Sequence, residues 1–328
     1  MAVNKITVNG RKLIDLSHDT VDQDSLLLNH SAHKKDGSSI SGSAIAYPGS
    51  DYYVDPNGIL YRVTSDTSAC RLRVMTYNVG DWYIGTHTRV PSEKVDTYLN
   101  IHRHIMETQS PDIAVFQEYW HYFDTNNTIT AKSVLDPYFS DIKEEWPYDG
   151  YGHGMASKSY VLENYKHYRF DAWASTVWDY GFERAYIHIN GKRICIINTW
   201  VEAGDLYFDE RASQLNQILE YVASEPYFII MGDFNIDCPD GPTGVYYNTY
   251  IKPFVDAGHT VCNNAVLDGS FRHYLTYYRL DGTSEALDQI ITSSNITVAN
   301  IFIDRTKLDD LVDDKVDHVP FLADLIIN

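Results

Sequence analysis

The stretch IIMGDFNID at residues 229–237 constrains the fold more than any other part of the sequence. Three apolar residues lead to Gly232, and Asp233 and Asn235 follow at the point where a buried strand should end. Polar side chains at the end of a core strand are held by rigid backbone and partly shielded from water, which is how a preorganised site is built. We therefore expect this strand to deliver its polar residues to the mouth of the core.

Further polar side chains stand at the ends of other apolar, strand-like runs or inside them, namely Asn78, Glu118, Asp288, Asp317 and His318. A single Asp or Asn after a strand is usually a turn former. As a set, however, these side chains offer hard oxygen atoms that suit Mg²⁺, Mn²⁺ or Ca²⁺ rather than zinc. The sequence therefore predicts a divalent-cation site among the strand ends.

Strand-like and helix-like segments alternate from about residue 72 onwards. Amphipathic helices are predicted over residues 91–110 and 207–223, and Asn190-Gly191 between two β-rich runs indicates a hairpin. Further strand-like runs lie at residues 73–79, 112–118, 227–235, 287–293 and 318–327. For residues 71–328 this order predicts an α/β (α+β) fold, a four-layered sandwich of two mixed β-sheets flanked by helices.

The overall composition is that of a globular protein, with 44% hydrophobic and 22% charged residues among 328. No apolar run approaches the roughly 20 residues needed to span a bilayer, so no transmembrane segment is predicted. The start, MAVNKITVNGRKLIDL, lacks an apolar central region, so we expect no Sec signal peptide. The four cysteines are scattered and form no CxxC pair, which indicates neither a zinc site nor a disulfide framework.

The net charge is −19, from 26 Lys and Arg against 45 Asp and Glu. Such a balance argues against a basic surface that binds nucleic acid by bulk electrostatics. A polyanionic substrate would therefore need metal ions to approach the site.

Residues 1–70 differ in character from the rest and are predicted to form a small β-rich module and linker. KITVNGRKLIDLS places Asn9-Gly10 between short alternating segments, which is a hairpin signal. Over residues 7–43 the pattern VNGxxLIDLSxDTVxxxxLLxxxxAHxxxGxxISG resembles short modules of tail and other structural proteins of phages and prophages of Gram-positive hosts. The resemblance implies virion attachment or oligomerisation, and a location on a phage or prophage particle or in the host cytoplasm. An uninformative N-terminal extension is the alternative.

The motifs MTYNV, FQE, GDFN, LDQI and DH, in this order and at these separations, resemble those of the endonuclease/exonuclease/phosphatase superfamily. That superfamily includes pancreatic deoxyribonuclease I, exonuclease III and bacterial sphingomyelinases, and the resemblance covers residues 72–328. It implies a divalent-metal-dependent phosphodiester hydrolase. Glu118 matches the family's metal-binding Glu, with Asn78 and Asp317 beside it in the metal shell. The implied cofactor is Mg²⁺, with Mn²⁺ or Ca²⁺ as alternatives.

The same resemblance implies roles for the other motif residues. Asp233 and Asn235 match the pair that orients the attacking water and the phosphate. Asp288 matches the Asp that supports the catalytic His. His318 matches the His that contacts the scissile phosphate or takes a proton from water. These roles agree with the chemistry, because a metal neutralises the charge of a phosphodiester and a positioned base supplies the nucleophile.

The sequence departs from the family pattern at Trp200. Many members end a hairpin strand in NTH, whose His is the general acid for the leaving oxygen, whereas this chain reads INTWVEA. An indole N–H cannot cycle a proton at neutral pH, so Tyr151, His153 and Glu202 are the nearby candidates. We expect Trp200 to form an apolar or stacking wall of the substrate cleft. Arg184 is predicted to contact phosphate, with a surface ion pair as the alternative.

Three functions are consistent with these observations. The leading one is a metal-dependent nuclease associated with a phage particle, with DNA as the favoured substrate. The second keeps the metal site but hydrolyses teichoic acid or phospholipid head groups. The third is a structural virion protein with a decayed site, which contacts other virion proteins through residues 1–70. Decay is disfavoured because all the predicted metal-shell residues are retained, and polar groups are costly to hold together in a core.

Overall fold

The computed structural model describes residues 70–80, 89–148, 151–172, 180–267, 269–279, 282–306 and 318–327, together with the backbone of six short strands before residue 70. The chain divides into two compact units, Met1–Cys70 and Arg71–Asn328. No helix in the described parts is long and apolar enough to cross a membrane.

The described backbone of the first unit forms three antiparallel strand pairs. These are β1 (Lys5–Val8) with β2 (Arg11–Asp15), β3 (Ser31–His33) with β4 (Ser39–Ser41), and β5 (Tyr52–Val54) with β6 (Leu60–Arg62). Strands β1 and β2 pair on either side of residues 9–10, as the Asn9-Gly10 signal predicts.

The second unit is built on two six-stranded mixed sheets. Sheet 1 has the order β21-β22-β7-β8-β10-β9, with the strands β7 (Cys70–Asn78), β8 (Ile113–Trp120), β9 (Asp141–Tyr148), β10 (Tyr151–Ser157), β21 (Ile296–Ile303) and β22 (Phe321–Ile327). Sheet 2 has the order β11-β12-β13-β14-β20-β15, with the strands β11 (Glu163–Arg169), β12 (Gly181–Ile189), β13 (Lys192–Trp200), β14 (Phe228–Asp233), β15 (Thr260–Val261) and β20 (Asp288–Thr292).

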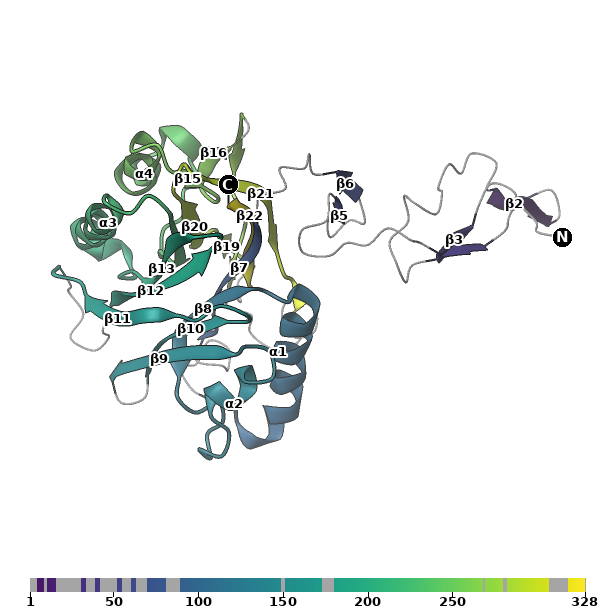
Figure 1. The fold of residues 1–328 in the computed structure, drawn as a ribbon, viewed down its shortest axis with the longest axis horizontal. Helices are drawn as coiled ribbons and strands as arrows, with labels where there is room; N and C mark the ends of the chain where they lie inside the picture. Colours follow the sequence, from purple (N-terminus) through teal and green to yellow (C-terminus); the bar gives the residue numbers. More distant parts are fainter. Residues whose placement is uncertain are drawn as a thin grey trace. The chain divides into compact units, whose positions relative to one another are not determined.

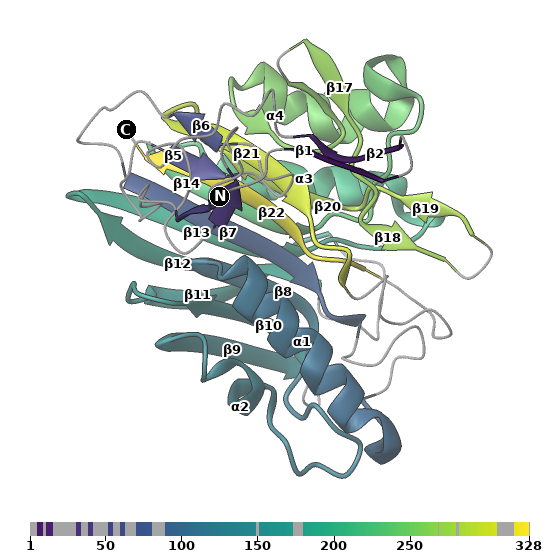
Figure 2. The same ribbon diagram turned by 90° about the vertical axis from the view of Figure 1, so that its right-hand side faces the viewer.

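Helices cover the outer faces of both sheets (Figures 1 and 2). α1 (Val95–Gln109) and α2 (Ala131–Leu135) pack against sheet 1, while α3 (Phe208–Val222) and α4 (Lys252–Asp256) pack against sheet 2. Short helical turns η2 (Ser92–Lys94), η3 (Asp205–Tyr207), η4 (Gly241–Thr243) and η5 (Tyr247–Ile251) accompany them. Two small hairpins follow β15 and precede β20 along the chain. They are β16 (Ala265–Leu267) with β17 (Ser270–Arg272), and β18 (Tyr277–Tyr278) with β19 (Ser284–Glu285). The predicted four-layered sandwich is confirmed.

The apolar faces of the helices explain this layering. In α1 the residues Tyr98, Ile101 and Ile105 repeat at helical spacing and are buried against Met75 and Phe116 of sheet 1. In α3 the residues Leu215, Ile218 and Val222 are buried against sheet 2 in the same way. The Asn190-Gly191 step forms the predicted hairpin between β12 and β13, because both residues adopt the positive φ that such a turn needs, 52° and 77°.

A ladder of buried polar side chains joins the two sheets at their centre. Gln117 of sheet 1 accepts a hydrogen bond from Thr76 at 3.3 Å and donates one to Asn198 of sheet 2 at 2.7 Å. Asn198 in turn donates to Glu183 at 3.0 Å, and Tyr165 donates to the other oxygen of that carboxyl group at 2.6 Å. Because buried polar groups must find partners, this ladder fixes how the sheets sit on each other.

Glu183 makes the stability of the fold depend on pH. Burial raises its pKa to about 8, although the hydrogen bonds from Tyr165 and Asn198 act in the opposite direction. Between pH 4.5 and about 8 the native state therefore binds more protons than the unfolded chain, so the free energy of unfolding falls as pH rises.

Replacing Glu183 by Gln should remove this contribution while keeping the shape of the side chain. The difference in unfolding free energy between wild type and Glu183→Gln should fall as pH rises, by on the order of 1 kcal/mol per pH unit within that window. Urea unfolding at a series of pH values measures it. A difference that stays constant with pH would contradict the raised pKa.

Candidate active site

The site lies where strand ends of both sheets meet. In sheet 2 the residues Trp200, Asp233 and Asp288 stand side by side on neighbouring strands. In sheet 1 Asn78, the last residue of β7, stands beside Gln117. Side chains from the two rows then converge, because Asn78 Nδ2 donates to Asp233 Oδ2 at 3.0 Å.

Gly232 allows β14 to approach β13 closely enough to form this row. It pairs with Thr199, and its φ is 155°. A Cβ atom at this position would lie 2.0 Å from the Thr199 carbonyl oxygen, which is backbone and cannot swing away. Only glycine fits here. Gly232 thus allows β14 to stay paired with β13 up to Asp233 at the strand end.

The loop after β14 is held by its own polar groups. The backbone N–H of Asn235 donates to Asp233 Oδ1 at 2.8 Å, and Asn235 Nδ2 donates to the Val201 carbonyl oxygen at 2.9 Å. Asn235 has a φ of 51°, a left-handed conformation that Asn tolerates better than most residues. Arg211 from α3 donates to the Asn235 carbonyl oxygen at 2.8 Å.

Glu118 reaches the site through a β-bulge. The pairing of β8 with β10 slips so that Gln117 and Glu118 stand opposite the single residue His153. Glu118 has a φ of 51°, which breaks the alternation of side chains along the strand. Its Oε1 accepts a hydrogen bond from Asn78 Nδ2 at 3.0 Å. The same amide nitrogen thus holds Glu118 of sheet 1 and Asp233 of sheet 2.

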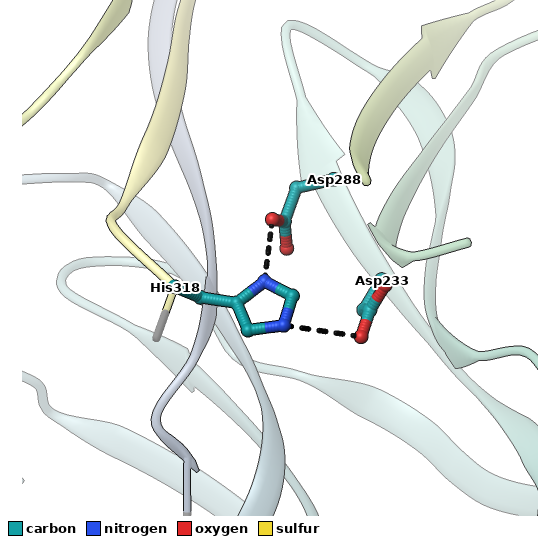
Figure 3. Close-up of side chains that lie close together, drawn as sticks. All are labelled: Asp233, Asp288 and His318. Atoms are coloured by element: carbon teal, nitrogen blue, oxygen red, sulfur yellow. Dashed lines mark hydrogen bonds and ion pairs between the residues drawn. The ribbon is translucent and has the colours of Figure 1, made fainter. Parts of the chain in front are cut away.

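His318 lies between two carboxylates, as Figure 3 shows. Its Nδ1 is 2.8 Å from Asp288 Oδ2, and its Nε2 is 3.6 Å from Asp233 Oδ2. All three residues are buried. One ligand atom from each lies within 4.8 Å of the others. In the described parts of the chain, no other three His, Cys, Asp or Glu residues bring their ligand atoms this close together.

Burial raises the pKa of Asp233 to about 7; nearby His318 lowers it, and the charge of Asp288 raises it again. A cation at this place would relieve the cost of ionising the carboxyl group. The oxygen atoms of Asp233 and Glu118 both lie 3.0 Å from Asn78 Nδ2, so two hard donors are already close together. This donor set fits a divalent ion of the Mg²⁺ type, which prefers carboxylate oxygens.

The structure thus brings together six of the predicted residues, namely Asn78, Glu118, Asp233, Asn235, Asp288 and His318. Asp317 lies outside the described residues. The amide nitrogen of Asn78 faces the two carboxylates, while its oxygen accepts the Gly80 N–H at 2.9 Å. Asn78 therefore holds the carboxylates by donating hydrogen bonds to them.

Trp200 is in the row of strand ends, but the residue is only 5% exposed and belongs to the core beside sheet 2. It packs 4.6 Å from the Tyr180 ring and 6.2 Å from the His153 ring, measured between centroids. Its stacking role stays a prediction. His153 and Glu202 are buried, while the Tyr151 side chain lies outside the described part of the molecule.

Arg184 is not brought to this row. Its Nη1 lies within hydrogen-bonding distance of the Tyr186 and Tyr221 hydroxyls, at 3.2 and 2.9 Å, and its Nη2 donates to the Asn164 carbonyl oxygen at 2.8 Å. Neighbouring Glu183 faces the other sheet, so Arg184 faces the opposite side of the strand. Phosphate binding by Arg184 stays a prediction that this position does not favour.

Tyr180 is a residue near the site that the sequence did not single out. Burial raises the pKa of its phenol, and the charges of Glu202, Glu118 and Asp233 raise it further, so the hydroxyl stays protonated. No motif distinguishes it among 26 tyrosines. Only the structure reveals it, because Tyr180 directly precedes Gly181, the first residue of β12 and the pairing partner of Trp200.

Comparisons with known proteins agree with this geometry. Residues 94–310, more than half of the chain, match the Endonuclease/Exonuclease/phosphatase family. No curated protein matches the sequence significantly.

Among solved structures, humanized D. rerio TDP2 has a TM-score of 0.59 at 14% identity, covering 78% of this chain and 98% of that one. D. rerio TDP2 complexed with a single strand DNA product has a TM-score of 0.57 at 14% identity, with the same coverage of 78% and 98%. The human Nocturnin catalytic domain with a bound sulfate anion has a TM-score of 0.57 at 18% identity, covering 78% and 93%. At such identities these likenesses establish the fold.

The chain belongs to the endonuclease/exonuclease/phosphatase family. It is a metal-dependent phosphodiester hydrolase of that family, with a candidate metal site of Asp233, Asp288 and His318.

Gly232→Ala should be strongly destabilising, because its Cβ would collide with the Thr199 backbone. We expect a loss of about 3 kcal/mol or more. Gly191→Ala is the matched control: the turn has a φ of 77° but open space around it, so only backbone strain of about 1–2 kcal/mol should appear. Chemical denaturation measures both, and equal losses would argue against the close approach.

Proposed function

We propose that this hydrolase is a nuclease that cleaves DNA with the help of Mg²⁺, with Mn²⁺ or Ca²⁺ as alternatives. The observation that carries the proposal is the convergence of Glu118 and Asp233, from different sheets, on the one amide nitrogen of Asn78. Oxygen donors gathered in this way suit a hard cation beside a phosphate.

Of the two clusters that could hold the ion, we place it at Glu118 and Asp233, with Asn78 beside it and Asp317 as a further ligand. The other cluster, Asp233, Asp288 and His318, then keeps His318 for proton transfer. A bound ion would supply charge neutralisation at the phosphate. Asn78 would keep the two carboxylates in place, because its amide nitrogen donates a hydrogen bond to each of them.

His318 and its two partners would handle the proton of the attacking water. Asp288 accepts the Nδ1 hydrogen of His318, which fixes the tautomer and leaves Nε2 towards Asp233. Nε2 can then take a proton, and the resulting positive charge is stabilised by both carboxylates. Asp233, held by the Asn235 backbone N–H, would orient the water at this nitrogen.

DNA is the favoured substrate because D. rerio TDP2, a protein of similar fold, is described in complex with a single strand DNA product. The net charge of −19 gives no long-range attraction for DNA. Teichoic acid and phospholipid head groups, which are also phosphodiesters, are the alternatives that an experiment has to separate.

The purified chain should cleave plasmid or single-stranded DNA in the presence of Mg²⁺ or Mn²⁺ and stop when EDTA is added. Glu118→Ala and His318→Ala should each lower the rate by at least about 10²-fold. Gel electrophoresis follows the DNA, and RNA is tested in parallel. Release of glycerol phosphate or phosphocholine, with DNA left intact, would replace the nuclease by the alternative substrates. If wild type matches Glu118→Ala on every substrate, the site has decayed.

Asp288→Asn tests the part of His318 separately. Asparagine can offer an N–H to Nδ1 and so favour the wrong tautomer, which should lower kcat by about 10²-fold or more with little change in KM. Steady-state kinetics at saturating metal measures this, with the melting temperature as a check on folding. A variant with wild-type kcat would remove the Asp288–His318 pair from the mechanism.

We further propose that residues 1–70 attach the enzyme to a virion. The support is the sequence pattern of residues 7–43 and the division of the chain into two compact units, Met1–Cys70 and Arg71–Asn328. Detection of the chain in purified particles of its phage would support attachment, and its recovery only in the soluble fraction of the host would argue for the host cytoplasm.

A further inference from the structure

A second histidine–carboxylate pair lies beside the loop that follows β14. Nε2 of His273 is 2.5 Å from Asp237 Oδ1, and the same oxygen accepts the Ala286 backbone N–H at 3.2 Å. The His273 ring stacks on Phe271, with centroids 6.3 Å apart and planes inclined by 21°. The imidazole is thus held in one orientation by its carboxylate and by an aromatic ring.

The pair is open to solvent, unlike His318. The side chains of His273 and Asp237 are 29% and 18% exposed, while those of His318 and Asp288 are 4% and 0% exposed. Nδ1 of His273 makes no hydrogen bond to any residue that the structure describes. One ring nitrogen is therefore fixed, and the other has no partner among the described residues.

Both supports of this pair come from segments that also build the site. Asp237 is four residues beyond Asp233, so their Cα atoms are at most about 14 Å apart. Ala286 is two residues before Asp288. From His273 the chain continues to Thr276, whose Oγ1 accepts the Asp288 backbone N–H at 3.0 Å. The imidazole is thereby placed at the same end of sheet 2 as the reacting groups.

We propose that His273, oriented by Asp237, binds a phosphate of a nucleic-acid strand a few nucleotides from the bond that is cleaved. This inference rests on the proposed nuclease function and narrows its substrate to a polymer with phosphates on both sides of the cleaved one. Successive phosphates of one strand advance by about 3.4 Å along the helix axis, so a strand bound at Asp233 reaches His273 within a few nucleotides.

The chemistry of the pair suits an anion. An imidazole that carries a hydrogen on both nitrogens can donate one to the Asp237 carboxylate and the other, from Nδ1, to a phosphate oxygen. A metal is a weaker candidate, because the described residues offer a group of three suitable ligands only at Asp233, Asp288 and His318. The role of the base in the cleavage step is already filled by His318, which lies between the two site carboxylates.

The test compares a single-stranded DNA oligonucleotide with bis(p-nitrophenyl) phosphate, a diester that has no neighbouring phosphate. For His273→Gln we expect KM for the oligonucleotide to rise about tenfold with kcat little changed. Activity on the small diester should stay at the wild-type level. The slope of log(kcat/KM) against log[salt] for the oligonucleotide should become shallower by about 0.7, the value for one lost phosphate contact on a single strand.

Two further variants complete the design. Asp237→Asn should change the oligonucleotide kinetics in the same direction as His273→Gln. His188→Gln is the matched control: His188 pairs with Glu163 at 3.5 Å and is 52% exposed, but it is near the other end of β12 from the site. This control should alter neither substrate. Circular dichroism and thermal melts establish that all three variants are folded.

The outcomes separate the two proposals. An unchanged KM and salt slope in His273→Gln, or an equal loss on both substrates, would overturn the phosphate contact and leave the nuclease standing. A wild-type enzyme that cleaves the small diester but no oligonucleotide would overturn the polymer substrate. Failure of the wild type on every phosphodiester would instead refute the proposed function itself.

Discussion

The contact on which the site depends is the double hydrogen bond of Asn78. Its amide nitrogen holds Glu118 of sheet 1 and Asp233 of sheet 2, each at 3.0 Å. The two carboxylates can meet only if the sheets are correctly aligned. The buried contact between Gln117 and Asn198 provides that alignment one residue away from Glu118. The core and the site are therefore parts of one arrangement, and a change in sheet packing alters the distance between the carboxylates.

Local backbone strain is concentrated at the same place. Glu118 and Asn235 both have a φ of 51°, and Gly232 lies against the Thr199 carbonyl group. Strained residues each cost of order 1–3 kcal/mol and persist only where the surrounding structure holds them. Here the neighbouring strands supply that support. The strain is what turns side chains that regular strands would point elsewhere towards a common point.

The sequence predicted much of this arrangement because its signals are local. Apolar runs with Asp, Asn or His at one end located the strands β7, β14 and β22, and Asn190-Gly191 located a hairpin. The bulge at Glu118 could not be predicted, because it is defined by the pairing with His153 on another strand. The same holds for Tyr180 and for the pair of His273 with Asp237, whose members are 36 residues apart. Such features arise from tertiary contacts, and no periodicity in the chain encodes them.

The order of the strands also determines when the site can form. β22, which follows His318, is the last strand of sheet 1 along the chain, yet it lies next to β7, the first. All of sheet 2 comes between them in the sequence. Contacts between such distant segments are slow to form, because a long loop must close first. A growing polypeptide on the ribosome therefore carries Glu118 and Asp233 well before it carries His318, and this hydrolase stays incomplete until almost all of unit Arg71–Asn328 has been synthesised.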